Sequence, residues 1–359
     1  MFINQYITKL KVEEKMKIKV GILGCTGAVG QKFISLLKDH PVFEISELVA
    51  SENSAGQQYK DRVNWKEAVP ISDKTGNITI KKIGDPLDAK ILFSGLDSSV
   101  AGEAETWYAE KGYAVVSNSK NHRMVDNVPL VIPEVNNSHF KLIYSQESYI
   151  KSGGFIVTNP NCAIVVMAMT LYPIHRDFGL SKVMVTTMQA ISGAGYPGVP
   201  SLDILGNVIP HIADEEKKVE TEAQKILGVL SGNKIDFADF KVSASCNRVP
   251  VRDGHSMSVS FETKIKASKE EIVSSLRNFK GLGLASSPEE VLVYFDSSYR
   301  PQPLLDVNSG NGMTVSVGNL RECSILDYKM SAFGHNTIRG AAGAAILNAE
   351  FLFQAGYIK

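Results

Sequence analysis

Residues 18–30 read Ile18-Lys19-Val20-Gly21-Ile22-Leu23-Gly24-Cys25-Thr26-Gly27-Ala28-Val29-Gly30. The apolar run over residues 18–23 predicts a β-strand, and Phe33, Leu36 and Leu37 continue at helical spacing after the glycines. Glycine at such a turn lets a pyrophosphate approach the backbone N–H groups of a helix N-terminus. The G-x-x-G-x-x-G spacing departs by one residue from the common dinucleotide fingerprint, and a merely structural turn is the alternative, but the order strand, turn, helix favours cofactor binding. The residues predicted to bind the dinucleotide are Gly24, Thr26, Gly27, Ala28, Val29 and Gly30.

Short β-type segments alternate with helix-period segments through the rest of the N-terminal half. Strands are predicted at residues 43–50, 91–93 and 114–116, and a helix at residues 100–111, which Gly112 ends. This alternation is typical of βαβ units on a mainly parallel sheet. We therefore predict an α/β, Rossmann-type doubly wound domain over residues 17–161, which would bind the dinucleotide.

The second half has a different pattern. A helix is predicted at residues 162–176, and longer strands at residues 182–192, 240–251, 256–264 and 313–318. Few helices separate these strands, so an α+β domain with a mostly antiparallel sheet is expected over residues 162–334. The alanine-rich helix at residues 338–355 begins with glycines that permit close backbone approach, and we expect residues 335–359 to return to the first domain.

Length and charge set the broad class of protein. A chain of 359 residues favours two domains. Lys plus Arg number 38, as do Asp plus Glu, and the charges are interspersed, so the electrostatic footprint of a nucleic-acid binder is missing. No apolar run is long enough to span a membrane. A small-molecule substrate is the expected ligand.

Cysteine usage and the N-terminus point to a reducing compartment. The four cysteines are scattered and have neither the number of a disulfide framework nor the spacing of a zinc site. We expect reduced thiols, a cytoplasmic location and no metal. Residues 1–16 lack the apolar core of a signal peptide and form an N-terminal extension to which no function is assigned.

The segment after the second predicted strand is where an adenosine ribose would lie. Ser51 and Ser54 in this segment have hydroxyls that can donate to a 2′-phosphate, which favours NADP over NAD. Glu52 would repel that phosphate if it pointed inward, and ordinary loop serines are the alternative interpretation.

Cys162 lies where the apolar stretch 155–157 gives way to a helix-like run. A thiol at a helix N-terminus has its anion stabilised by the macrodipole and by unpaired N–H groups, which can also hold an oxyanion. Such a position suits a nucleophile that attacks an acyl carbon. The alternative is a buried structural cysteine, because free cysteine is among the most buried residue types.

Three further polar residues lie in strand-like segments. Gln189 precedes a glycine-rich loop, and Arg248 and His255 flank an Asp-Gly turn signal that predicts a hairpin presenting both side chains to one pocket. Arginine offers a planar fork for a carboxylate, and histidine titrates near neutral pH. A solvated arginine and a structural histidine are the alternatives.

Two cationic positions complete the set. Arg123 follows a predicted strand of the parallel sheet, at the edge where such folds bind ligands. Glu215 and Lys218 are about one helical turn apart and share a face. Solvent exposure with ion pairing is the alternative for that charged helix.

Together, these motifs resemble the aspartate-semialdehyde dehydrogenase family. The resemblance rests on the glycine turn, on Asn159-Pro160-Asn161-Cys162, on Gln189 with Ser192-Gly193-Ala194-Gly195, on Arg248 followed by His255, and on Asn336-Thr337-Ile338-Arg339-Gly340-Ala341-Ala342-Gly343. It extends from about residue 17 to the C-terminus and is strongest to the archaeal and fungal branch. It implies a glyceraldehyde-3-phosphate-dehydrogenase-like catalytic and dimerisation domain, NADP as cofactor, and a homodimer or homotetramer.

The resemblance also implies the roles of individual residues. Cys162 would be the nucleophile, His255 the acid and base, and Gln189 the residue that orients the acyl group. Arg248 would bind the substrate carboxylate and Glu215 its amine, while Arg123, Asn161 and Lys218 would bind phosphate. Ser192, Gly193 and Asn336 would contact the cofactor. A protonated His255 beside Cys162 would lower the pKa of the thiol.

The chain departs from the family pattern at two places. It has Ala163-Ile164 where relatives often carry Ser or Thr after the nucleophile, and Asn53 near where they carry Arg. The second change predicts only a moderate preference for NADP, with NAD accepted as well. Malonyl-CoA reductase is the nearest alternative function, N-acetyl-glutamyl-phosphate reductase a more distant one, and a catalytically silent NADP-binding regulator belongs to a different class.

Overall fold

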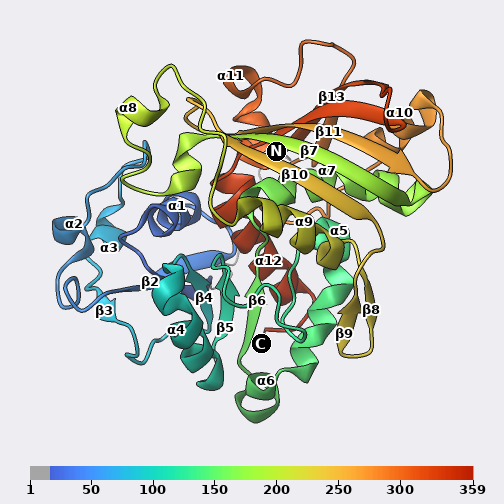
Figure 1. Cartoon of the computed structure of the whole chain (residues 1–359). Helices are drawn as coiled ribbons and strands as arrows, with labels where there is room; N and C mark the ends of the chain where they lie inside the picture. The colour runs from blue at the N-terminus through green and yellow to red at the C-terminus, as the bar shows by residue number, and fades with distance from the viewer. Residues whose placement is uncertain (1–16, 359) are drawn as a thin grey trace, which may run out of the picture.

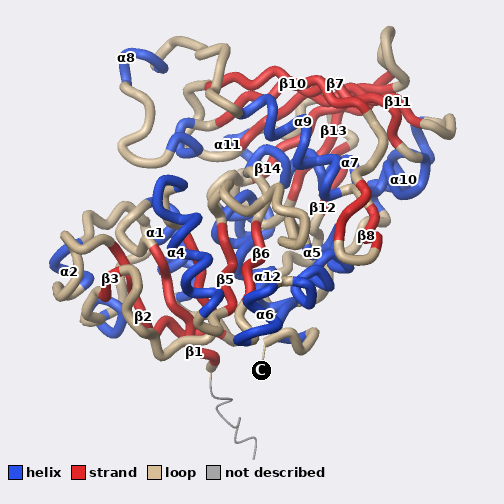
Figure 2. Tube along the Cα trace, turned by 60° about the horizontal axis from the view of Figure 1, so that its bottom comes forward, coloured by secondary structure: helices blue, strands red, loops and turns tan. Residues whose placement is uncertain are grey.

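The chain folds around two separate six-stranded sheets, which lie in different parts of the molecule in Figures 1 and 2. The computed structural model describes residues 17–358, so the predicted extension over residues 1–16 lies outside the described residues. The first sheet has the order β3 (Lys81–Lys82), β2 (Phe43–Ala50), β1 (Ile18–Leu23), β4 (Ile91–Ser94), β5 (Ala114–Ser117), β6 (Phe155–Thr158). All of these neighbours pair in parallel, as predicted for a doubly wound domain.

Both faces of the first sheet are covered, because alternate side chains of each strand point in opposite directions. On β4, Ile91 and Phe93 enter one apolar cluster and Leu92 enters another. The first cluster also contains side chains of α1 (Ala28–Leu37), η1 (Asn137–Ser145) and α12 (Gly343–Gln354), and the second those of α4 (Ser98–Glu110). In Figure 1, α12 from the red end of the chain lies beside the strands of this sheet, which it contacts at β4 and β5.

The second sheet is mixed and larger than the sequence predicted. Its order is β10 (Lys241–Arg248), β7 (Leu180–Gln189), β11 (His255–Thr263), β14 (Tyr328–Gly334), β13 (Val315–Glu322), β12 (Leu292–Phe295). Three of its five pairings are antiparallel and two are parallel. The strands β12 and β14 were not predicted, and β7 ends at Gln189 because the chain turns there into η2 (Ile191–Ala194).

One predicted pairing is wrong. The strands that carry Arg248 and His255 do not form a hairpin, because β7 lies between them, parallel to β10 and antiparallel to β11. The connection over residues 249–254 crosses the end of β7 and bonds to it: the N–H of Val249 donates to the carbonyl of Gln189. Such a connection is long enough to step over one strand, so the turn signal before His255 did not determine which strands pair.

Helix α7 (Cys162–Phe178) leads from the first sheet to the second. It packs against the second sheet with α9 (Glu215–Ile226) and α10 (Lys269–Arg277), and most of its residues are buried. A run of this apolar character belongs inside a protein rather than on its surface. The shorter helices are α2 (Tyr59–Arg62), α3 (Asp73–Gly76), α5 (Pro133–Asn136), α6 (Glu147–Ser152), α8 (Ser201–Ile204), α11 (Pro303–Asp306) and η3 (Ser309–Gly312), and β8 (Val229–Ser231) pairs with β9 (Lys234–Asp236).

The predicted C-terminal helix begins with a wider turn. Residues Ile338–Ala342 form the π-helix η4, in which the N–H of Gly340 donates to the carbonyl of His335, and α12 follows directly. Single π-turns of this kind often occur at functional sites. An ideal Cβ at Gly340 would lie 2.7 Å from Cβ of Cys162 and 3.0 Å from its Cα, so glycine is required for η4 to reach the start of α7.

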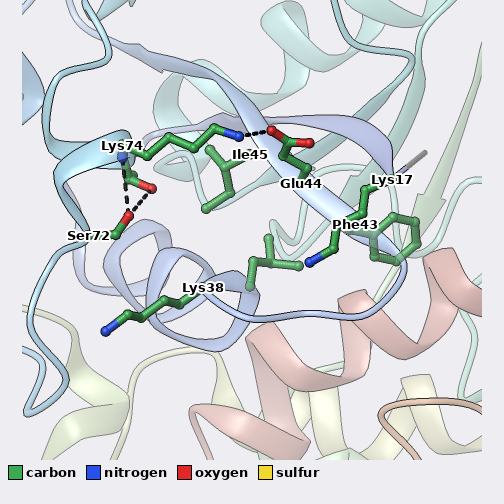
Figure 3. Close-up of a pocket in the computed structure, with 9 residues that line it drawn as sticks. Lys17, Lys38, Phe43, Glu44, Ile45, Ser72 and Lys74 are labelled. Atoms are coloured by element: carbon green, nitrogen blue, oxygen red, sulfur yellow. Dashed lines mark hydrogen bonds and ion pairs between the residues drawn. The ribbon is translucent and has the colours of Figure 1, made fainter. Parts of the chain in front are cut away.

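A basic pocket lies at the amino ends of the strands of the first sheet, whereas the glycine turn lies at their carboxyl ends (Figure 3). Lys17 directly precedes β1 and Glu44 lies near the start of β2, where it pairs with Lys74. Ligands of open parallel sheets bind at the carboxyl ends of the strands, and this pocket is at their amino ends. It is therefore not part of the active site. Among residues 17–358, no helix is long and apolar enough to cross a membrane.

The stability of the fold is expected to fall in mild acid because His139 is buried in its neutral form. Burial lowers the pKa of His139 to about 4, although its Nε2–H donates to the carbonyl of Gly228. Since the unfolded chain protonates near pH 6.5, the contribution of His139 is complete above that pH and is lost as the pH falls toward 4.

The measurement is the free energy of urea unfolding at pH 7.5 and pH 5.0, at one protein concentration. Between these pH values we expect the free energy of unfolding to fall by roughly 2 kcal/mol less in His139→Gln than in the wild type. Equal losses in the two proteins would contradict the role of His139.

Candidate active site

The candidate site is centred on the contact between Cys162 and His255. Strand β6 ends at Thr158, and α7 begins at Cys162 after the N-cap residue Asn161, whose Oδ1 accepts the N–H of Ala163 at 2.9 Å. The Sγ atom of Cys162 lies 3.0 Å from Nε2 of His255. The imidazole lies at the start of β11 in the second sheet, and the thiol lies at the start of α7. The pair is thus formed by two different elements.

The hydrogen bonds of His255 determine its tautomer. Its Nδ1 accepts the backbone N–H of Ala190 at 3.1 Å. A neutral imidazole that accepts at Nδ1 carries its proton on Nε2, so the Nε2–H points toward the sulfur of Cys162. Full protonation would place a second N–H against that of Ala190, and the backbone therefore disfavours the imidazolium.

The pKa values agree with a neutral pair in the free site. Burial raises the pKa of the Cys162 thiol to about 12, with Glu215 adding to the rise, whereas Arg123, Arg248 and the N–H of Ala163 act in the opposite direction. Burial, with Arg248 second, lowers the pKa of His255 to about 3. Desolvation therefore outweighs the helix N-terminus in the free site, and the lowering of the thiol pKa by a protonated His255 stays a prediction.

Gln189, Arg248 and His255 lie close together at one end of the neighbouring strands β10, β7 and β11. Arg248 pairs in register with Gln189, and Ser256 pairs with Met188, so the neighbouring His255 is next to both. Arg248 is 6% exposed, and its Nη1 donates to the carbonyl of Ala190 at 2.8 Å. The structure thus brings these three residues together through strand order rather than through the predicted hairpin.

Glu215 joins the polar side chains on the other side of the thiol. Its Oε1 accepts from Nδ2 of Asn161 at 2.8 Å and from Nε2 of Gln189 at 3.0 Å, and its Oε2 lies 3.2 Å from Nζ of Lys218. These partners outweigh burial and hold the pKa of the Glu215 carboxyl below its usual value. Solvent exposure, the alternative for this helix, does not apply to Glu215, which is 5% exposed.

Arg123 reaches the same region from the loop after β5. It is buried, its Nη1 contacts Oε1 of Glu222 at 3.1 Å, and its Nη2 donates to the carbonyl of Asn118 at 2.8 Å. Its partner Glu222 also accepts the backbone N–H of Asn161, the residue before Cys162, and Arg123 therefore lies near the thiol. The structure therefore gathers all of the residues predicted for catalysis and substrate binding around Cys162.

The residues predicted for the nicotinamide half of the cofactor also lie here. An ideal Cβ at Gly193 would lie 2.9 Å from Nη1 of Arg248 and 3.1 Å from Cε1 of His255. Asn336 donates from Nδ2 to the hydroxyl of Ser192 at 2.8 Å and accepts the N–H of Gly254 at 2.8 Å. At Gly193 it is therefore the backbone, rather than a side chain, that approaches Arg248 and His255.

The glycine turn and the end of β2 lie side by side. The N–H groups of Gly24 and Cys25 both donate to the carbonyl of Val49, which brings the turn next to the segment with Ser51 and Ser54. Ser51 is exposed, whereas Ser54 is buried. Only Ser51 thus presents an open surface to a ligand in this arrangement.

Two residues near the site were missed in the sequence. Glu222 and Lys225 are 2% and 1% exposed, and they contact the loop of Arg123 and the residue before Cys162. Their signal was present: with Glu215 and Lys218 they repeat at helical spacing, so all four share one face of α9. A charged helix face is ordinarily assigned to solvent, and this is why they were overlooked.

Two family models match the chain in tandem. One describes the NAD-binding domain of semialdehyde dehydrogenases and matches residues 19–143; the other describes their dimerisation domain and matches residues 171–339. The fold and the site therefore define a semialdehyde dehydrogenase, a class of oxidoreductase.

Similar proteins narrow the class. An aspartate-semialdehyde dehydrogenase from Archaeoglobus fulgidus is 49% identical over 94% of this chain and 99% of its own length, and one from Aspergillus fumigatus is 44% identical over 95% and 99%. The solved structure of the Candida albicans aspartate-semialdehyde dehydrogenase with NADP superposes with a TM-score of 0.88 at 41% identity, over 96% of this chain and 100% of that one. The chain belongs to the aspartate-semialdehyde dehydrogenase family.

Proposed function

We propose that this protein catalyses the reversible NADPH-dependent reductive dephosphorylation of L-4-aspartyl phosphate to L-aspartate 4-semialdehyde. This reaction serves the synthesis of lysine, threonine, methionine and isoleucine. The observation that carries the proposal is the 3.0 Å contact between Cys162 and His255 at the start of α7, in a chain of this family. The thiol supplies a nucleophile, and the imidazole an N–H beside it.

The glycine turn fits a dinucleotide. An ideal Cβ at Gly30 would lie 2.2 Å from the carbonyl oxygen of Gly24, so the turn is tight enough to exclude any side chain there. Helix α1 has no side-chain cap and no acidic residue in its first turn, which leaves its N-terminal N–H groups for a pyrophosphate. When bound, the nicotinamide supplies a hydride to the acyl carbon in one direction and accepts it in the other. Residues proposed to hold the dinucleotide are Gly24, Thr26, Gly27, Ala28, Val29, Gly30, Ser192, Gly193 and Asn336.

NADP is proposed as the preferred cofactor, with NAD accepted as well. The Candida albicans relative was solved with NADP, which supports the first part. Ser51 and Ser54 are the proposed partners of the 2′-phosphate, and the exposed hydroxyl of Ser51 is the more accessible of the two. Since neither serine is charged, the preference is expected to be moderate.

Cys162 is proposed as the nucleophile toward the acyl phosphate. Its proton passes to Nε2 of His255 in the tautomer whose other nitrogen, Nδ1, carries a proton. The sulfur then forms a bond to the acyl carbon, the bond from that carbon to the phosphate oxygen breaks, and phosphate leaves with the electron pair. Arg123, Asn161 and Lys218 are proposed to bind this phosphate. The resulting thioester still accepts a hydride, whereas a carboxylate would not, and the covalent step thus divides one difficult reaction into two easier ones.

His255 is proposed to act on the oxygen of the thiohemiacetal formed at Cys162. The tautomer that accepts from Ala190 directs Nε2–H at the reacting group, where it would stabilise the negative oxygen by hydrogen bonding. Accepting a proton at Nε2 in the oxidative direction requires the other tautomer, in which Nδ1 carries the proton and releases the N–H of Ala190.

The two ends of the amino-acid substrate are assigned to opposite charges. Arg248, buried and bonded through one nitrogen to Ala190, has further N–H groups for the α-carboxylate. Glu215 is proposed to bind the substrate amine, for which its lowered pKa keeps it ionised. Gln189 is proposed to orient the acyl group, and its amide already bonds to Glu215.

The wider organisation follows the same family pattern. We propose a cofactor-binding domain over residues 17–161, a catalytic and dimerisation domain over residues 162–334, and a C-terminal return over residues 335–359. The family model of the dimerisation domain supports a homo-oligomer, and we propose a homodimer or homotetramer. Met184 and Met188 on β7 are exposed and suit such an interface. The four unpaired thiols favour a cytoplasmic location.

A substrate comparison tests this function. We expect NADP⁺ reduction with aspartate semialdehyde and phosphate. In the reductive direction, kcat/KM for NADPH oxidation should be at least about 100-fold lower with malonyl-CoA than with aspartyl phosphate, because malonyl-CoA has no amine to pair with Glu215. NADPH is expected to exceed NADH by about tenfold in kcat/KM. Malonyl-CoA as the better substrate would reject the proposal, and a strong preference for NADH would reject the cofactor assignment.

A further inference from the structure

One face of α9 carries charged residues that the reaction does not use. Glu222 and Lys225 continue the spacing of Glu215 and Lys218, but they lie deeper, with side chains almost fully buried. Buried charges require partners, because an unpaired charge inside a protein is strongly unfavourable. The partners of these two residues therefore show what they hold in place.

Glu222 divides its carboxylate between two parts of the active site. Its Oε1 accepts from Nη1 of Arg123 at 3.1 Å, and its Oε2 accepts the backbone N–H of Asn161 at 2.9 Å. Asn161 directly precedes Cys162, so one side chain connects the guanidinium to the peptide at the start of α7. No other residue of the described chain bonds to both Arg123 and the Asn161 backbone.

Lys225 fixes the loop that carries Arg123. Its Nζ donates to the carbonyls of Arg123 at 2.7 Å, Val125 at 2.8 Å and Val128 at 3.1 Å. All three protons of an ammonium are thus used on one loop. Burial lowers the pKa of Lys225 to about 8, and the nearby acidic groups Asp126 and Glu222 counteract that shift.

The guanidinium of Arg123 has N–H groups left for a ligand. Nη1 is bonded to Glu222 and Nη2 to the carbonyl of Asn118, whereas the buried Nε–H has no partner among the described residues. A donor in this condition is set for a ligand that accepts a hydrogen bond. Its direction depends on the two anchored nitrogens, because the guanidinium is planar and rigid.

We infer that Glu222 is a positioning residue for the phosphate subsite, which orients Arg123 and couples it to the Asn161–Cys162 peptide. The inference rests on the proposed function, in which Arg123 binds the phosphate that leaves or attacks. Glu222 does not touch the substrate and acts through Arg123. A Glu222 that merely stabilised the fold would change the melting temperature but not the affinity for phosphate.

The test measures KM for phosphate and for aspartate semialdehyde in the oxidative direction. For Glu222→Gln we expect KM for phosphate to rise about tenfold, with KM for the semialdehyde within about twofold of wild type. Glu220→Gln is the matched control, because Glu220 lies on the same helix and also accepts a backbone N–H, that of Ala244, away from the thiol. The control is expected to leave both constants unchanged.

A double substitution separates this inference from the proposed role of Arg123. Arg123→Gln is expected to raise KM for phosphate at least as much as Glu222→Gln, and adding Glu222→Gln to it should change that constant by no more than about twofold. A wild-type KM for phosphate in Glu222→Gln, or full additivity in the double variant, would overturn the inference while leaving the role of Arg123 intact. A wild-type constant in Arg123→Gln would overturn both. If Glu222→Gln does not fold, Glu222→Asp replaces it, since aspartate keeps the charge but withdraws it by one methylene, and the same outcomes apply.

Discussion

Replacing Cys162 by serine is expected to lower kcat for NADP⁺ reduction by at least about 10⁴-fold. A hydroxyl at this position is far less nucleophilic than a thiol and would leave the acyl group as a poorly reducible ester. Binding of the cofactor should be retained, because the glycine turn lies on a different segment from α7. The measurement is the rate with aspartate semialdehyde and phosphate, in steady state and in a single turnover.

Cys323→Ser provides the control for this substitution. Cys323 is partly exposed in the turn that follows β13, its sulfur accepts the N–H of Leu326, and it takes no part in the proposed chemistry. We expect it to keep its rate within about twofold of wild type, as surface changes usually do. A Cys162→Ser enzyme with more than a tenth of the wild-type rate would disprove the covalent route.

His255→Gln is expected to lower kcat by about 10²- to 10⁴-fold, because it removes the N–H that faces the reacting oxygen. His175→Gln makes the same exchange at the far end of α7, where Nδ1 likewise accepts a backbone N–H, that of Leu180. The control should retain most of the activity. Loss of activity in both variants to the same extent would indicate damage to the fold rather than to the site.

The pH dependence of thiol alkylation gives a second readout for the same pair. Since the pKa of Cys162 is raised to about 12 and that of His255 lowered to about 3, the thiolate fraction of the free enzyme grows about tenfold per pH unit between pH 6 and 9. Alkylation by iodoacetamide should follow this slope without a plateau, in wild type and in His255→Gln alike. A plateau near neutral pH that disappears in His255→Gln would show a preformed thiolate–imidazolium pair and contradict the neutral site.

Local patterns were sufficient for most of the first sheet and for the start of the site. The short β-type runs at β1, β2, β4 and β5 predicted these strands to within about a residue, because a strand buried on both faces needs a short, nearly continuous apolar run. The turn at residues 24–30 was equally readable, since its geometry requires glycine in the sequence. Cys162 could be found because the transition from strand to helix is itself a local pattern.

Strand order in the second sheet could not be predicted in this way. The turn signal before His255 describes four residues, but pairing depends on which strand lies beside another, and β7 occupies the place between β10 and β11. Glu222 and Lys225 were missed for a related reason. Their helix looks charged along its length, and only the loop of Arg123, about 100 residues away in the sequence, makes one of its faces an interior surface.

By itself the sequence determined most elements and their chemistry: a glycine turn after a strand, a thiol at a helix start, and the arginine, glutamate, glutamine and histidine side chains proposed for the reaction. These are properties of short segments, because spacing and residue type set local conformation. The tertiary structure alone decided that Gln189, Arg248 and His255 meet at one end of three neighbouring strands, that Glu222 joins Arg123 to the peptide before Cys162, and that the thiol lies in contact with a buried imidazole. Strand order and desolvation arise from contacts between distant segments, and no local pattern contains them.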